Sequence, residues 1–572
     1  MHRHVLAVAL VAAIAMTACH TPSERMAEAP PPPSPTADMA LDRIVATGSR
    51  QREEAARLQQ QMHRAMPAAM APAPSMAAPY PVHVPLPANT EHYAERDDNP
   101  VQRVAEQPVS TFSIDVDTGS YSNVRRMIRS GTRPPADAVR AEEFINYFDY
   151  GHPGPASLET PFLATTEIAP APWDTRRHLL MIGIKGFDVP KAQLPPANLV
   201  FLLDTSGSMN SPDKLPLLKQ AFAELTGQLR AQDRVSIVVY AGSAGLVLPP
   251  TPGDRKDEIL GALERLEAGG STNGGDGIRL AYAMARRGFI DGGVNRVILA
   301  TDGDFNVGTV DGGSLETMVA DQRRSGIALT TLGFGHGNYN DHLAERLADA
   351  GDGNHAYIDT LQEARKVLVE EMSSTLLTIA QDVKIQLEFN PALVSEYRLI
   401  GYENRMLARE DFANDRVDAG DIGAGHEVTA LYEITLAGSG GDRLPALRYA
   451  PAATPSEASK GGELAHLRLR YKRPGETQSR LIETPVTRAQ MRVQPGESMR
   501  FAATVAAFAD ALRGGTHLGG WDWPSIVASA RDAQGRDSWK LRAELVELVE
   551  ASAAMTRGGG DGGAFAAPPV AN

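Results

Sequence analysis

Strand-like apolar runs alternate with helix-like segments through the middle of the chain. Residues 198–203, Asn-Leu-Val-Phe-Leu-Leu, form a continuous apolar run of the kind expected for a strand buried on both faces. Further strands are predicted at 234–240, 296–300, 327–332 and 355–358, and helices at 214–229, 255–266, 277–287, 314–324, 341–350 and 361–379. This alternation predicts an α/β fold, a doubly wound and mostly parallel sheet with helices on both faces.

Strands of a different type flank this region. Apolar and polar residues alternate over 383–389, 428–436 and 466–471, and strands are also predicted at 111–117, 160–168 and 178–186. A period of two indicates strands with one exposed face. We therefore expect a β-rich domain, built from strands before and after the α/β domain, so that the α/β domain is inserted in it. The C-terminal part is predicted to be helical, at 498–512 and 539–551.

The N-terminus carries a targeting signal. A short basic start precedes an apolar run over residues 5–18, which is shorter than the roughly 20 residues that span a bilayer. This run ends in Met16-Thr17-Ala18 and is followed by Cys19. These four residues resemble a bacterial lipobox, although Met16 stands where that motif usually has Leu. The resemblance implies a lipoprotein signal peptide and a lipid attached to Cys19. A plain cleavage site followed by an unrelated cysteine is the alternative.

Composition divides the rest of the chain. The stretch after Cys19 is rich in Pro, Ala and Met and cannot bury enough apolar area to offset the entropy of ordering. We expect it to be a disordered tether. The predicted division is a signal peptide at 1–18, the tether at 19–98, an α+β segment at 99–194, the α/β domain at 195–380, a β-rich then helical domain at 381–556, and a disordered tail at 557–572.

Charge and motifs exclude several classes of function. The 572 residues include 56 Lys+Arg and 70 Asp+Glu, a net charge of −14, which argues against a nucleic-acid partner. A single cysteine excludes a disulfide framework and any multi-cysteine metal site. The chain has no HExxH, no GxSxG, no P-loop and no candidate cysteine nucleophile. We therefore expect a protein that is not an enzyme.

Oxygen-bearing side chains gather at the predicted strand ends. Asp204, Ser206 and Ser208 follow the first strand at alternating positions, Thr272 lies in a Gly-rich loop, and Asp302 follows a later strand. The carboxyl ends of parallel strands meet at one edge of a sheet, which brings such side chains together. Carboxylates and hydroxyls form a set suited to a hard cation.

This set resembles the metal-ion-dependent adhesion site of the von Willebrand factor type A family. The resemblance covers about residues 198–379, and all five site positions match. It implies that Ser206, Ser208 and Thr272 donate hydroxyl ligands, and that Asp204 and Asp302 hold the ion directly or through water. Mg²⁺ is the usual ion, with Mn²⁺ or Ca²⁺ as other divalent choices. It also implies a partner protein whose acidic side chain completes the coordination.

The layout as a whole resembles the YfbK-like group of bacterial von Willebrand type A lipoproteins. The matching sequence segments are Ser113–Thr118, Glu142–Phe148, Asp204–Met209 and Ala300–Gly308. This resemblance spans about residues 100–555 and supplies architecture more than activity. It implies a lipid-anchored protein of the bacterial cell envelope. His20 after the cysteine is typical of sorting to the outer membrane. The protein would there face either the periplasm or the cell surface.

Two other functions remain open at this stage. One is a passive envelope scaffold whose metal only stiffens the fold. The other is a hydrolase, for which His336 and His355 near strand ends are candidate bases. Metal-dependent, saturable binding of a partner separates adhesion from a scaffold, and turnover of a substrate separates both from an enzyme.

Overall fold

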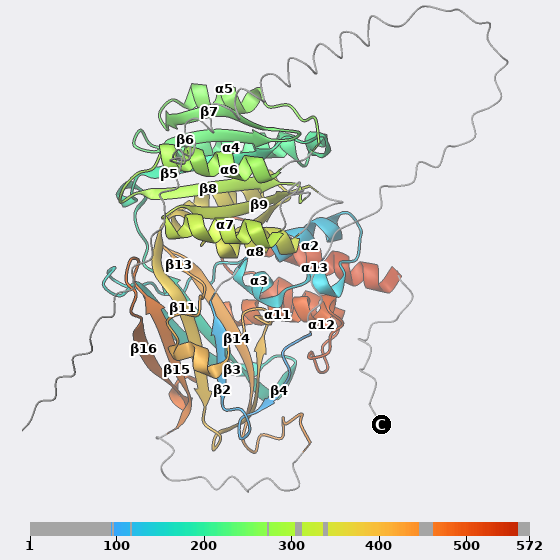
Figure 1. Ribbon diagram of the computed structural model, residues 1–572. Helices are drawn as coiled ribbons and strands as arrows, with labels where there is room; N and C mark the ends of the chain where they lie inside the picture. Colours follow the sequence, from blue (N-terminus) through green and yellow to red (C-terminus); the bar gives the residue numbers. More distant parts are fainter. Residues whose placement is uncertain are drawn as a thin grey trace, which may run out of the picture.

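A six-stranded sheet organises the middle of the chain (Figure 1). The computed structural model of the protein describes residues 93, 97–114, 117–271, 274–303, 312–335, 341–445 and 462–558. The strand order is β10 (His355–Ile358), β9 (Ala328–Phe334), β8 (Val294–Thr301), β5 (Ala197–Asp204), β6 (Arg234–Tyr240) and β7 (Ala244–Pro252). All neighbouring strands are parallel except β6 and β7. The predicted mostly parallel sheet is confirmed.

Alternate residues of β5 face two hydrophobic cores. Leu199, Phe201 and Leu203 pack under one set of helices, and Val200 and Leu202 pack under another. The first set is α4 (Leu215–Gln228), α5 (Lys256–Glu264) and α9 (Leu361–Arg365), and the second is α6 (Gly274–Arg287), α7 (Gly312–Arg324) and α8 (Asp341–Ala350). Because every residue of β5 is buried, its middle, residues 199–203, is apolar, and the buried polar residues Asn198 and Asp204 stand near its two ends.

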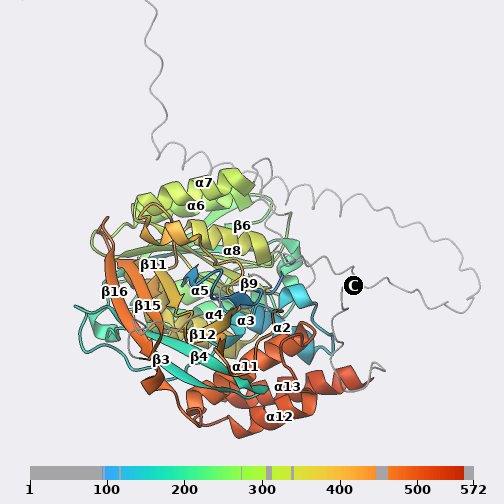
Figure 2. The same cartoon turned by 90° about the horizontal axis from the view of Figure 1, so that it is seen from below.

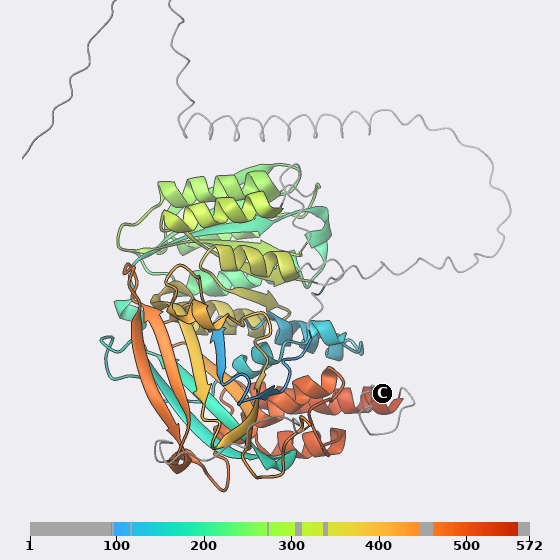
Figure 3. The same ribbon diagram turned by 60° about the horizontal axis from the view of Figure 1, so that its bottom comes forward.

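Two antiparallel sheets form a sandwich beside this α/β unit (Figure 3). One sheet has the order β1 (Gln102–Arg103), β12 (Val394–Ile400), β14 (Glu427–Leu436), β4 (Asp174–Gly186) and β3 (Phe162–Ala171). The other has the order β13 (Ile422–Gly423), β11 (Thr378–Phe389), β15 (Glu463–Lys472) and β16 (Arg480–Thr487), with β2 (Val109–Ser113) also paired to β11. Since β3 and β4 precede the α/β unit and β11 follows it, the predicted insertion is confirmed.

Helices cover the outer face of the first of these sheets (Figure 2). They are α2 (Gly119–Arg129), α3 (Ala141–Asn146), α11 (Glu497–Leu512), α12 (Trp523–Asp532) and α13 (Leu541–Gly558). Leu179 and Met181 of β4 pack against these helices, whereas Leu180 and Ile182 point into the sandwich core. This strand is therefore apolar on both faces. The strand predicted over 428–436 with one exposed face, β14, is likewise buried on both faces, so that prediction is wrong.

The segment predicted as one helix over 361–379 is shorter and broken. It consists of α9, the π-helical turn η4 (Lys366–Glu370) and α10 (Met372–Leu376). From Thr378 the chain belongs to β11, where Ile379 and Ala380 are buried in the sandwich core. Burial in the sheet therefore overrides the local helical pattern.

Four of the longer elements are missing from the sequence prediction: β7, β12, β16 and α12. β7 contains three prolines, Pro249, Pro250 and Pro252, which an edge strand tolerates because its outer N–H groups need no partner. α12 begins after Asp522, whose carboxylate accepts a hydrogen bond from the Ser525 backbone N–H at 3.0 Å. The remaining short turns are η1 (Ala136–Ala138), η2 (Lys191–Gln193), η3 (Gly207–Asn210), η5 (Arg409–Ala413) and η6 (Arg488–Gln490).

A buried ionic network around Arg125 of α2 joins the helical and α/β units. Its guanidinium, 2% exposed, binds the carboxylate of Asp359 after β10 and donates to Glu363 Oε2 of α9 at 2.7 Å. It also donates to the Tyr147 hydroxyl at 2.7 Å and to Glu544 Oε1 of α13 at 3.0 Å. Each bond joins a different segment to the same cation.

The N-terminal predictions lie outside the described residues. The signal peptide, Cys19 and residues 19–92 of the predicted tether are not described, nor is the tail after residue 558. Within the part of the chain that is described, no helix is long and apolar enough to cross a membrane.

The buried His152 predicts a loss of stability in acid. Its Nε2 lies 2.9 Å from Thr429 Oγ1, and its ring packs so closely on Gly183 that a Cβ there would lie 2.2 Å away. Burial lowers the pKa of His152 to about 4. Since the unfolded chain takes up a proton near pH 6.5 and the folded one does not, stability falls as the pH drops from 6.5 to 4.

His152→Gln should remove part of this acid sensitivity. Chemical unfolding at pH 7.5 and 4.5 measures it. Between these two pH values, we expect the free energy of unfolding of the variant to fall by about 1–3 kcal/mol less than that of the wild type. A parallel loss in both proteins would contradict the interpretation.

Candidate metal centre

The loop after β5 is held in place by the backbone of its neighbours. Asp204 ends the strand, and its Oδ1 accepts a hydrogen bond from the Ser206 N–H at 2.8 Å. The Thr205 N–H donates to the Tyr240 carbonyl of β6 at 3.0 Å, and the Gly207 N–H donates to the Gly270 carbonyl at 3.0 Å. The loop therefore has a defined shape that directs alternate side chains to one place.

The two serine hydroxyls of this loop are spaced as ligands of one ion. Ser206 Oγ and Ser208 Oγ lie 3.0 Å apart. An octahedral Mg²⁺ with bonds of 2.0–2.1 Å places adjacent oxygens about 3.0 Å from one another. Ser206 is buried and Ser208 is exposed, so the pair reaches from the core of the loop to its surface.

Asp302 lies at the same edge of the sheet, at the end of the neighbouring strand. It follows β8, which pairs with β5, and it is fully buried. Its Oδ2 accepts a hydrogen bond from Lys214 Nζ at 2.9 Å. The stem of Lys214 passes over Gly335, where a Cβ would lie 2.3 Å from it. Lys214 thus offsets one of the two carboxylates with a positive charge.

Among the described residues, no cation pairs with Asp204. Its Oδ2 is buried and has no hydrogen bond of good geometry from the described residues. Burial raises the pKa of Asp204 to about 7, and the charge of Asp302 adds to the rise, while the Ser206 hydrogen bonds and the Tyr240 hydroxyl partly offset it. A divalent cation beside Oδ2 would remove the cost of holding this carboxylate ionised, so the residues present fit such an ion.

The structure brings four of the five predicted ligands to one edge of the sheet: Asp204, Ser206, Ser208 and Asp302. Thr272 lies outside the described residues, as do Cys19 and His336. The hydrolase candidate His355 is buried, with Nδ1 2.8 Å from Thr331 Oγ1, and lies at the start of β10, away from this edge.

Lys214 is the site residue that the sequence analysis missed. A lysine at the start of a predicted helix is ordinarily exposed, and no spacing rule connects it to Asp302, which lies 88 positions away. Its burial can be recognised only once β5 and β8 are paired.

A cavity of about 940 Å³ lies near the other edge of the sheet. Its lining includes Arg296, Thr330 and His355, near the amino ends of β8, β9 and β10, and Asp421 and His426 of the sandwich segment. Burial lowers the pKa of Arg296 to about 10 and that of His426 to about 4. The cavity is lined by both polar and apolar side chains, and it is separate from the candidate metal centre.

Three stretches of the chain match known families. Residues 198–371 match the von Willebrand factor type A domain, and residues 87–181 match the family described as von Willebrand factor. Residues 374–555 match the C-terminal region of the uncharacterized protein YfbK.

Several known proteins are similar to this chain. The chain is 50% identical over 473 residues to the uncharacterized protein YfbK of Escherichia coli K12, covering 82% of each chain. It is 26% identical over 353 residues to an uncharacterized Synechocystis protein, covering 60% of this chain and 77% of that one. Among solved structures, a von Willebrand factor type A protein from Catenulispora acidiphila is 14% identical, with a TM-score of 0.39, covering 69% of this chain and 91% of that one.

Mg²⁺ should stabilise the protein through Ser208. We expect added Mg²⁺ to raise the thermal unfolding temperature, because an ion at 100 times its Kd contributes about 2.7 kcal/mol. Ser208→Ala removes one exposed ligand and should remove most of this Mg²⁺-dependent rise without changing the metal-free unfolding temperature. Scanning calorimetry with Mg²⁺ and with EDTA measures both.

Ser211→Ala is the matched control, since Ser211 lies three positions further on and its hydroxyl donates to Asp213. This variant should respond to Mg²⁺ like the wild type. An equal rise in Ser208→Ala and in the wild type would show that Ser208 is not a ligand.

Proposed function

Because this chain belongs to the YfbK group of von Willebrand factor type A proteins, we propose that it is an envelope-anchored protein that binds a partner protein through a divalent metal ion. A type A domain indicates protein–protein interaction or adhesion. Binding through a metal ion is the mode that we propose for this chain. Mg²⁺ is the proposed ion, with Mn²⁺ or Ca²⁺ as substitutes. An acidic side chain of the partner completes its coordination.

The observation that carries the proposal is Asp204 Oδ2, a buried oxygen with no hydrogen bond of good geometry from the described residues, beside two correctly spaced hydroxyls. A buried carboxylate oxygen without a partner is costly, and a metal ion is the group that both satisfies it and uses the neighbouring serines. Asp204, Ser206, Ser208 and Asp302 are the ligands proposed among the described residues, and Thr272 is the proposed fifth.

Charge favours an acidic ligand from outside. Asp204 and Asp302 contribute two negative charges, while a divalent ion and the Lys214 ammonium contribute three positive ones. The loaded site therefore keeps one net positive charge, which attracts a carboxylate. The surface around Ser208 is open to a partner, since Gly207 and Asn210 are also exposed.

Anchoring is the second part of the proposal. The lipobox-like Met16–Cys19 supports a lipid on Cys19, and several acyl chains on one cysteine would hold the protein firmly on a membrane. We place the protein in the bacterial cell envelope, on the outer membrane, with the tether between the lipid and the folded part.

Partner capture tests the binding proposal. The full chain in detergent is immobilised and exposed to solubilised envelope proteins with Mg²⁺ or with EDTA, and so are Asp204→Ala, Ser208→Ala and the control Ser211→Ala. A partner should be retained only by the wild type and Ser211→Ala, and only with Mg²⁺. Neutralising the contacting Asp or Glu of that partner should then abolish binding.

Retention of the same proteins under all conditions would contradict this function. It would favour the passive scaffold, in which the sandwich and the helical unit make the contacts and any metal is structural.

Cys19→Ser tests the anchor. We expect the wild type to stay with the membrane fraction after washing at high salt and to incorporate a labelled fatty acid, because acyl burial does not depend on ionic strength. The variant should be unlabelled and released by the wash. A labelled or membrane-bound Cys19→Ser protein would show that another feature holds it there.

A further inference from the structure

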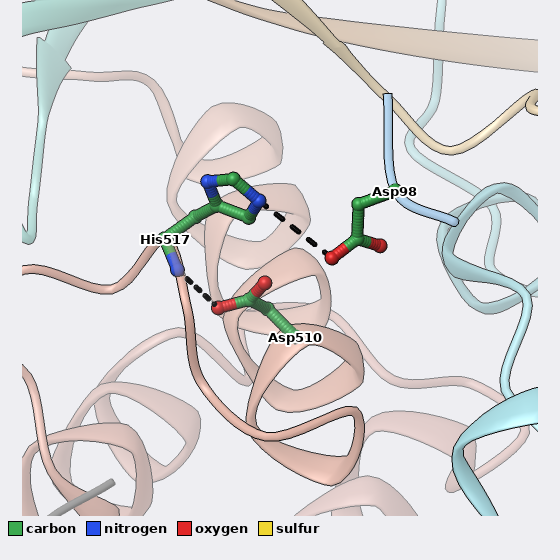
Figure 4. Close-up of side chains that lie close together, drawn as sticks. All are labelled: Asp98, Asp510 and His517. Atoms are coloured by element: carbon green, nitrogen blue, oxygen red, sulfur yellow. Dashed lines mark hydrogen bonds and ion pairs between the residues drawn. The ribbon is translucent and has the colours of Figure 1, made fainter. Parts of the chain in front are cut away.

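A separate group of metal-ligand side chains joins the two ends of the folded chain. Asp98 precedes β1, Asp510 lies in the last turn of α11, and His517 lies in the loop that follows α11 (Figure 4). One ligand atom from each residue lies within 4.8 Å of the other two. None of these residues belongs to the edge of the sheet that carries Asp204.

The three side chains converge on one point. Asp98 Oδ2 lies 3.6 Å from His517 Nε2. Figure 4 shows that the second carboxylate oxygen of Asp510 points toward the space between them. Ligands of a tetrahedral Zn²⁺, with bonds of 2.0–2.2 Å, are about 3.4 Å apart, so small side-chain shifts close the site.

Other groups hold the carboxylates in this orientation. Arg513 Nη2 donates to Asp98 Oδ1 at 2.6 Å, which leaves Oδ2 to face His517. The His517 N–H donates to Asp510 Oδ2 at 3.1 Å, which leaves Oδ1 to face the same space. Gly515, with φ of 73°, lets the chain reverse after α11 and return His517 toward Asp510. Such outer contacts fix first-sphere ligands in metal sites.

The space between the side chains has the size of one ion or water. A void of about 20 Å³ is lined by Asp98, Asp510 and His517, together with Glu403 and Arg398. Arg398 is 5% exposed, and its Nε lies 3.8 Å from Glu433 Oε2, outside the void. The three carboxylates outnumber the Arg398 and Arg513 guanidiniums, so the void favours a cation.

We propose that Asp98, Asp510 and His517 bind a transition-metal ion of the Zn²⁺ type, with a water as the fourth ligand. Imidazole nitrogen with carboxylate oxygens favours Zn²⁺ over Mg²⁺, which prefers oxygen alone. The ion would cross-link the segment before β1, which carries Asp98, to the helical unit, which carries Asp510 and His517. It acts independently of the proposed adhesion site.

Equilibrium dialysis of the full, tag-free chain against Zn²⁺ in excess Mg²⁺ tests the site. We expect His517→Gln and Asp98→Asn each to weaken binding of one Zn²⁺ more than roughly tenfold, since even outer-sphere losses reach that range. The control His466→Gln, on β15, and the adhesion-site variant Asp204→Ala should bind like the wild type.

Hydrogen exchange gives a second readout. Zn²⁺ should slow exchange of backbone amides over residues 97–104 in the wild type, and not in His517→Gln. The proposal is overturned if the wild type retains no Zn²⁺, or if Zn²⁺ binding and exchange are the same in the wild type and both site variants.

Discussion

A buried cation, the guanidinium of Arg125, joins the helical part of the molecule to the α/β unit. Asp359 and Glu363 reach it from the α/β unit, and Glu544 reaches it from α13. Loss of a partner in a buried network of this kind costs about 3–5 kcal/mol, because the remaining charges stay out of water. Although the α/β unit is an insertion, it cannot turn against the helices without breaking these bonds.

The same rule explains the candidate metal centre. Several buried carboxylates in this fold pair with a cation, and the chain supplies Arg125 for Asp359 and Lys214 for Asp302. In the described part of the chain no cation pairs with Asp204, so only one of the two carboxylates at this edge has a cation beside it. Helices cover both faces of the sheet, and the carboxylate without a cation lies at the carboxyl ends of its strands.

Local pattern predicted much of the fold and little of its electrostatics. The apolar run of β5 and the spacing of Asp204, Ser206 and Ser208 are visible in the sequence because each depends on neighbouring residues. The β11 strand was partly lost in a predicted helix, since Ile379 is placed by the sandwich core and not by its neighbours. Contacts such as Asp98 with His517 join residues about 400 positions apart, which no spacing rule reveals.

The insertion of the α/β unit has a mechanical consequence. The unit leaves the sandwich after β4 and returns to it at β11, and these strands belong to different sheets. Neither is an edge strand, because β4 lies between β14 and β3 and β11 has β2, β13 and β15 beside it. A pulling force applied at Asp204 would therefore divide between two sheets. It would shear several rows of hydrogen bonds together and could not unzip them one at a time.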